Sequence, residues 1–97
     1  MRAKLIFHEK VRFPDGAILE MVLWVLPEKT KDHPHGLKYR LHYGLPGKTR
    51  VRYDNERGKG DHRHIDEREE PYDFSDVETL RADFFRDIET IRGESLG

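Results

Sequence analysis

Two histidines at alternating positions, His62 and His64, have the residue type and spacing best suited to chemistry in this sequence. In an extended segment, residues two apart point to the same side, so both imidazoles would face one substrate. Histidine has an ordinary pKa close to neutral pH, which allows a pair to divide the roles of base and acid. We therefore expect His62 and His64 to act as an acid/base pair. The alternative interpretation is a pair of solvated, inert rings in a charged loop.

The segment Arg52-Tyr53-Asp54-Asn55 suits the same kind of reaction, although Asp-Asn at a strand end is also ordinary turn chemistry. Arg52 can hold a phosphate through two parallel hydrogen bonds, and Asp54 can orient a histidine. Metal-free RNA cleavage requires a group that takes the proton of the 2′-hydroxyl, another that protonates the 5′-oxygen, and cations near phosphorus. We expect His42 to be a reserve for the proton transfers. The cations expected to bind the substrate are Arg52, Arg50, Arg40 and Lys38.

A metal site is the alternative for the same histidines. His62 and His64 with one carboxylate would give a ligand set of two histidines and one acid, which divalent metals accept. The carboxylates considered for this set are Asp54, Asp61 and Asp66. The spacing permits such a site but is not diagnostic of one, so the expected mechanism uses no metal and no cofactor.

Two other polar segments are interpreted as solvated. His33 and His35 flank Pro34 in an apparent loop, with Asp32 as the neighbouring carboxylate. The acidic residues at positions 66, 67, 69 and 70 could form a cluster for a divalent cation, but charge runs of this kind are usually solvated.

Four segments predict the strands that would position these residues. Residues 3–13, 37–43 and 49–55 alternate between apolar and polar side chains, as half-buried strands do. Residues 17–26 are apolar on both faces except at Glu20, which favours a central strand. The segments 37–43 and 49–55 are expected to pair as an antiparallel hairpin. One face of this hairpin would carry Lys38, Arg40, His42, Arg50, Arg52 and Asp54.

A C-terminal helix is predicted after a basic loop over 56–64 and an irregular acidic stretch over 65–74. Ser75 and Glu78 have the spacing of a capping box, and Gly93 is a stop signal. The helix would bury a stripe of Val77, Leu80, Phe84, Ile88 and Ile91. The expected fold is α+β in a single domain over residues 1–97. It has a four-stranded antiparallel sheet with one C-terminal helix packed on one face and the other face open and basic.

Aromatic side chains alternate with cations in two of these strands. Tyr39, Tyr43 and Tyr53 would suit base stacking, but their phase places them beneath the helix. We therefore expect them in the core, together with Trp24 and Phe84.

Composition and charge limit the class of protein. The 97 residues are 35% apolar and 38% charged and include no cysteine, which excludes disulfide and thiolate chemistry. The longest apolar run, residues 21–26, is too short for a membrane span, and no signal peptide is predicted, so we expect a cytoplasmic protein. Residues 36–64 carry eight lysines and arginines against three acids, whereas residues 65–97 have a balance of −7. The basic middle suits a polyanion such as RNA, and the acidic end suits a basic partner.

Taken together, these motifs resemble the TumE family of type II toxin proteins. The resemblance covers residues 3–92; the gap over 56–61 lacks the proline and additional histidines of many members. The matching positions are Tyr39, His42, Tyr43, Arg52, Tyr53, Asp54, Asn55, His62, His64 and the segment 75–85. The resemblance implies a toxin encoded beside a helix-turn-helix antitoxin. Ribonuclease activity is our inference from the basic face and the histidine pair.

Three functional hypotheses follow. The first is a toxin that acts on RNA as a metal-independent ribonuclease and binds a cognate helix-turn-helix antitoxin. The second is a non-catalytic module that binds nucleic acid or protein. The third is a metal-dependent nuclease or a nucleotide-modifying toxin. The sequence predicts no membrane contact and leaves open whether the chain forms a homodimer.

Overall fold

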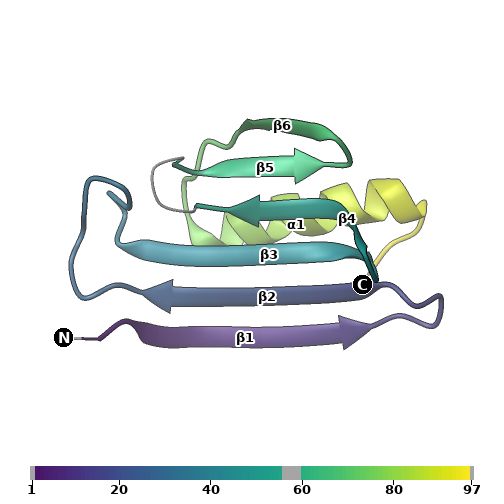
Figure 1. The fold of residues 1–97 in the computed structure, drawn as a ribbon, viewed down its shortest axis with the longest axis horizontal. Coiled ribbons are helices and arrows are strands. Elements are labelled where there is room, and N and C mark those ends of the chain that lie inside the picture. The colour runs from purple at the N-terminus through teal and green to yellow at the C-terminus, as the bar shows by residue number, and fades with distance from the viewer. Residues whose placement is uncertain (1, 56–59, 97) are drawn as a thin grey trace.

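The computed structural model describes residues 2–55 and 60–96 of the chain. In these residues the strands pair with their neighbours in sequence, in the order β1-β2-β3-β4-β5-β6, and every pair is antiparallel (Figure 1). The elements are β1 (Lys4–Arg12), β2 (Ile18–Val25), β3 (Leu37–Leu45), β4 (Lys48–Asp54), β5 (His62–Ile65), β6 (Arg68–Pro71) and α1 (Val77–Arg92).

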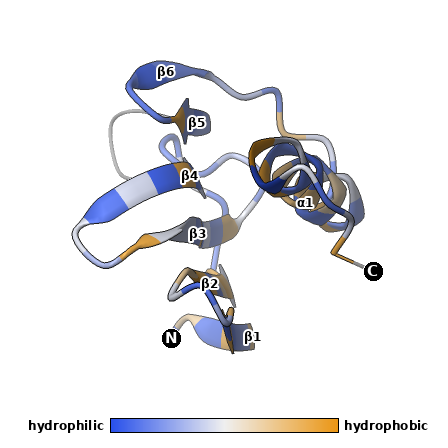
Figure 2. Cartoon of the chain, turned by 90° about the vertical axis from the view of Figure 1, so that its right-hand side faces the viewer, coloured by the Kyte–Doolittle hydropathy of each residue, from blue (hydrophilic) through white to orange (hydrophobic). Residues whose placement is uncertain are grey.

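The α+β class and the helix packed on an antiparallel sheet are confirmed. The four predicted strands correspond to β1, β2, β3 and β4, and α1 lies against one side of the sheet, next to β4. Figure 2 shows the described part of the sheet edge-on, with α1 on one side. We call the opposite side the open face.

The prediction of four strands was wrong, because the described sheet has six. Residues 62–65 and 68–71, expected in a basic loop and an acidic irregular stretch, form the hairpin of β5 and β6. The two residues between them include Asp66 at a φ of 53°, the left-handed conformation that tight hairpin turns require. Charged residues occupy both faces of this hairpin, so it lacks the apolar alternation that predicts a strand. Residues 56–59 of the expected loop lie outside the described residues.

The start of α1 differs from the predicted capping box. The N-cap is Asp76, whose side chain accepts a hydrogen bond of 2.7 Å from the backbone N–H of Thr79. This bond lowers the pKa of the Asp76 carboxyl, because the charged form is the better acceptor. The predicted stop is confirmed: Gly93 is the C-cap and has a φ of 72°, which glycine adopts without strain.

The core lies between α1 and the sheet. The helix buries Leu80, Phe84 and Ile88, and the expected burial of Tyr39, Tyr43 and Tyr53 is confirmed. Each tyrosine hydroxyl has a polar partner at the rim of the core, as buried phenols require.

Trp24 does not belong to this core, contrary to expectation. It is half-buried, and its register partner on β3 is the exposed Lys38. The side chains of β2 that meet the helix side are those of Leu19, Met21 and Leu23, so strand alternation places Trp24 on the open face.

The loop over residues 26–36 lies against the end of β4, and its two histidines have protein partners. His33 donates from Nε2 to the carbonyl oxygen of Asn55 at 2.9 Å, and His35 contacts the Asp61 carboxylate at 3.0 Å. Both rings therefore have structural partners, which corrects their interpretation as solvated.

No described helix has the length and apolar character that crossing a membrane would need.

Candidate active site

The cross-strand register gathers predicted site residues into two adjacent rows on the open face. In the first row, His42 of β3 lies opposite Arg52 of β4, which lies opposite His64 of β5. The second row consists of Arg40, Asp54 and His62 in the same three strands. Because side chains alternate along a strand, both rows point away from α1. Residues 40 to 64 thus converge on one patch without any contribution from the helix.

Asp54 is the buried anion of this patch, with 2% of its surface exposed. Its Oδ2 lies 3.1 Å from Nε of Arg52, and its Oδ1 lies 2.6 Å from Nε2 of His62. Neither oxygen has an aligned hydrogen-bond donor among the described residues, so these contacts are ion pairs rather than hydrogen bonds. A buried carboxylate needs compensating positive charge, and Arg52 supplies it.

Both ring nitrogens of His62 face oxygen atoms. Its Nδ1 hydrogen-bonds the carbonyl oxygen of Gly60 at 3.0 Å, so Nδ1 carries a proton. Its Nε2 faces the Asp54 carboxylate, and a bare lone pair there would meet a negative oxygen. With both nitrogens facing oxygens and 6% of its side chain exposed, His62 is a positioning residue beneath the surface.

His64 is more accessible and stands between two partners of opposite charge. Its Nε2 lies 2.9 Å from a terminal nitrogen of Arg52 and 2.6 Å from a carboxylate oxygen of Glu69. Arginine only donates and a carboxylate only accepts, so the two contacts suit different protonation states. Unprotonated Nε2 accepts from Arg52, and protonated Nε2 donates to Glu69. This arrangement is suited to a residue that gains and loses a proton.

His42 has the opposite electrostatic setting. Burial lowers the pKa of its imidazole, and the neighbouring charges of Arg40 and Arg52 lower it further. Its Nε2 is 3.0 Å from Oγ1 of Thr49. His42 is therefore neutral at physiological pH and suited to accept a proton.

The expected cations divide into two groups. Lys38 and Arg40 are exposed at register positions opposite Trp24 and Val22, on the open face. Arg50 instead forms an ion pair with Asp66 of the β5–β6 turn. Arg50 thus stabilises the hairpin.

Glu69 is the residue of this patch that sequence reasoning missed. It belongs to the acidic run interpreted as solvated, but β6 places it opposite His64. The signal in the sequence is the spacing: with a two-residue turn at 66 and 67, residues 64 and 69 must pair.

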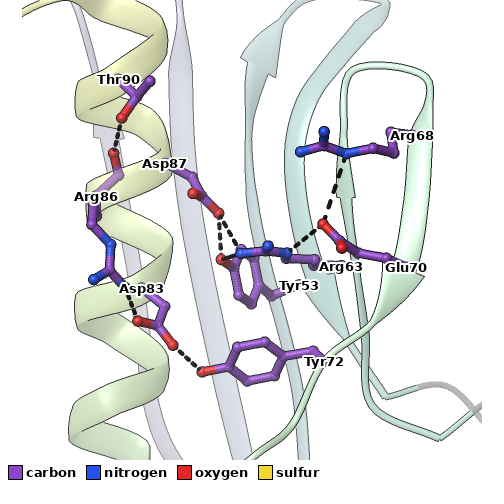
Figure 3. Close-up of polar contacts among 9 residues, drawn as sticks. All are labelled: Tyr53, Arg63, Arg68, Glu70, Tyr72, Asp83, Arg86, Asp87 and Thr90. Carbon is purple, nitrogen blue, oxygen red and sulfur yellow. Dashed lines mark hydrogen bonds and ion pairs between the residues drawn. The ribbon is translucent and has the colours of Figure 1, made fainter.

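The strands of the patch are held from the helix side by a second polar group, shown in Figure 3. Asp87 of α1 accepts from the Tyr53 hydroxyl and pairs with Arg63 at 3.4 Å. Arg63 also pairs with Glu70 at 2.9 Å. In the sequence, Tyr53 lies between Arg52 and Asp54, and Arg63 lies between the two site histidines. This network therefore fixes β4 and β5 from the helix side of the sheet.

The other end of the patch is fixed by the loop contacts. Asn55 is fully buried and bonds both the N–H of Tyr39 and the carbonyl oxygen of Leu37, which joins the end of β4 to the start of β3. The Asp61 carboxylate accepts a hydrogen bond of 2.7 Å from the Tyr39 hydroxyl and pairs with His35. Asp61, the residue that precedes His62 in the sequence, therefore has a structural role.

One set of described residues has the arrangement of metal ligands: a ligand atom from each of His62, His64 and Glu69 lies within 4.8 Å of the others. Two observations weigh against a cation here. Nε2 of His62 already faces Asp54, and the guanidinium of Arg52 lies 2.9 Å from Nε2 of His64. The positive charge of the Arg52 guanidinium would repel a divalent ion bound at this position.

These features define a class: a small α+β protein with a meander sheet, one covering helix, and a cluster of histidine, arginine and acid on its uncovered side. The model of the TumE family, described as toxin TumE, matches residues 2–92. The chain therefore belongs to the TumE family, and the resemblance inferred from its motifs is confirmed. Comparison with curated proteins and with solved structures gives no match.

Proposed function

We propose that this chain is the toxin of a type II toxin–antitoxin pair and cleaves RNA on its open face without a metal. The observation that carries the proposal is the row His42–Arg52–His64, in which a guanidinium has an imidazole on either side. Adjacent strands are about 4.8 Å apart, so the two imidazoles belong to strands separated by roughly 10 Å. A phosphate held by Arg52 would lie between them.

The proton transfers follow from the charges around each ring. His42, kept neutral by burial and by two arginines, takes the proton of the 2′-hydroxyl. The freed oxygen forms a bond to phosphorus, and the bond from phosphorus to the 5′-oxygen breaks. His64, protonated beside Glu69, gives its proton to that 5′-oxygen. The products are a 2′,3′-cyclic phosphate and a 5′-hydroxyl.

Asp54 and His62 support this reaction from below. Asp54 orients the Arg52 guanidinium, and His62 contacts the other oxygen of the same carboxylate and so holds it in position. The sequence prediction of His62 as a proton carrier stays a prediction; its engaged nitrogens favour His42 and His64 for that role.

A cleavage assay with purified protein and short RNA tests the proposal. We expect cleavage in the presence of a chelator, with cyclic phosphate ends, and no cleavage of the all-deoxy oligonucleotide. His42→Ala and His64→Ala are each expected to lower the rate by about 100-fold or more. Arg86→Gln is the control, because Arg86 is exposed on α1 and pairs with Asp83 of the same helix, away from the open face.

Two outcomes would reject the mechanism. Cleavage that is lost on chelation and restored by one divalent metal would move the site to the ligand set of His62, His64 and Glu69. Salt-sensitive RNA binding without cleavage would make the chain a binding module.

We further propose that the cognate antitoxin is a helix-turn-helix protein that covers the open face with acidic side chains. The exposed cations Lys38 and Arg40 support an acidic partner there. The same surface would then serve both substrate binding and inhibition.

A further inference from the structure

Trp24 is the least expected side chain on the open face. It stands outside the hydrophobic core, and its strand neighbours are Leu5 on β1, Val22 on β2 and Lys38 on β3. The indole is half-buried, so part of the ring remains accessible on this face.

The surface is hollowed around this indole. One depression of about 460 Å³ is lined by Trp24, Val22, Lys38, Tyr39, Arg40, Asp54 and Asn55. A second depression, of about 420 Å³, is adjacent to the first, because Trp24, Val22 and Arg40 line both. The first depression borders Asp54, and Asp54 pairs with both Arg52 and His62. The second depression borders His42, so both depressions adjoin the candidate active site.

We propose that Trp24 is the stacking platform of a base-binding subsite for single-stranded RNA, an inference that rests on the function proposed above. A flat apolar ring flanked by cations suits a nucleotide: the base stacks on the indole, and Arg40 and Lys38 contact its phosphates. Single strands are specified because the bases of a duplex are already stacked and do not offer a free face.

The chain carries its own reporter for this contact, because Trp24 is its single tryptophan. A short single-stranded 2′-O-methyl RNA lacks the nucleophilic hydroxyl and so binds without being cleaved. We expect it to quench the tryptophan emission of the wild-type protein, while anisotropy of a labelled copy reports binding. The same sequence as a duplex is expected to leave the emission unchanged.

Variants separate stacking from general binding. Trp24→Ala is expected to weaken binding of the single strand by about 5- to 150-fold, the range for loss of one stacked base. Trp24→Phe keeps a ring and is expected to restore most of the affinity. Phe85→Ala removes a half-buried aromatic of α1 on the helix side and is expected to change affinity by less than twofold. Thermal unfolding of each variant checks that it is folded.

The outcomes distinguish this inference from the proposed function. Binding by anisotropy with unchanged emission, and Trp24→Ala binding as well as wild type, would overturn the subsite while leaving RNA cleavage intact. Quenching without cleavage of ordinary RNA would retain the subsite and reject the ribonuclease. A chain that neither binds nor cleaves RNA would reject both.

Discussion

At the scale of single residues, protonation is set by the neighbours of each histidine rather than by the histidine itself. Both ring nitrogens of His62 face oxygen acceptors, whereas burial and two arginines lower the pKa of His42. The three histidines of the patch therefore have three different environments. The partners of His64, Arg52 and Glu69, suit either of its protonation states.

The lowered pKa of His42 predicts a dependence of stability on pH. Because the folded pKa lies below the unfolded value of about 6.5, the unfolded chain binds the extra proton more readily. The free energy of unfolding should therefore fall as pH drops below about 6.5, and His42→Gln should reduce that fall. Urea denaturation at neutral and mildly acidic pH measures both slopes, and equal slopes for the two proteins would contradict the prediction.

At the scale of elements, each edge of the patch is fixed by a contact on the opposite side of the sheet. The network of Figure 3 joins α1 to β4 and β5 through alternate residues, so a change beneath the sheet reaches the open face through the backbone.

Asp87→Asn tests this coupling. The substitution removes the charge that pairs with Arg63, and we expect a loss of about 1–3 kcal/mol in the free energy of unfolding. We also expect shifted ring resonances for His62 and His64 in the NMR spectrum. Asp83→Asn is the matched control, because Asp83 of the same helix bonds Tyr72, outside β4 and β5. Ring resonances that move equally in both variants would show that Asp87 has no specific role in positioning β5.

The start of the helix gives a second prediction at this scale. Asp76→Ala removes the side chain that bonds the Thr79 N–H and is expected to lower the free energy of unfolding. Ser75→Ala should have a smaller effect, since Asp76 is the N-cap. Chemical denaturation of the two variants decides between them, and the reverse order would restore the capping box expected from the sequence.

At the scale of the whole molecule, the uneven charge of the chain becomes a difference between two surfaces. The basic middle of the sequence forms β3, β4 and β5, and the acidic end forms β6 and α1. On the described strands of the open face, cations outnumber acids: Lys10, Arg12, Lys38, Arg40 and Arg52 against Glu20, Asp54 and Glu69.

This charge distribution predicts salt-dependent RNA binding. If Lys38, Arg40 and Arg52 each neutralise one phosphate, the logarithm of the binding constant should fall with the logarithm of salt with a slope of about −2 for a single strand. Lys38→Gln should make that slope shallower by about 0.7. Arg86→Gln, on the exposed side of α1, is the control and should leave the slope unchanged. A slope near zero for the wild-type chain would argue against phosphate contacts on this surface.

The sequence by itself determined the first four strands, the helix, the burial of Tyr39, Tyr43 and Tyr53, and the family. These follow from local periodicity and from motif residues that lie close together in the chain. The tertiary structure alone decided that residues 62–71 form two further strands, that Glu69 lies beside His64, and that Trp24 faces away from the core. The physical reason is that charged strands have no apolar alternation: ion pairs within the hairpin and the contact of Arg63 with Asp87 of α1 stabilise them, and neither leaves a hydrophobic pattern in the sequence.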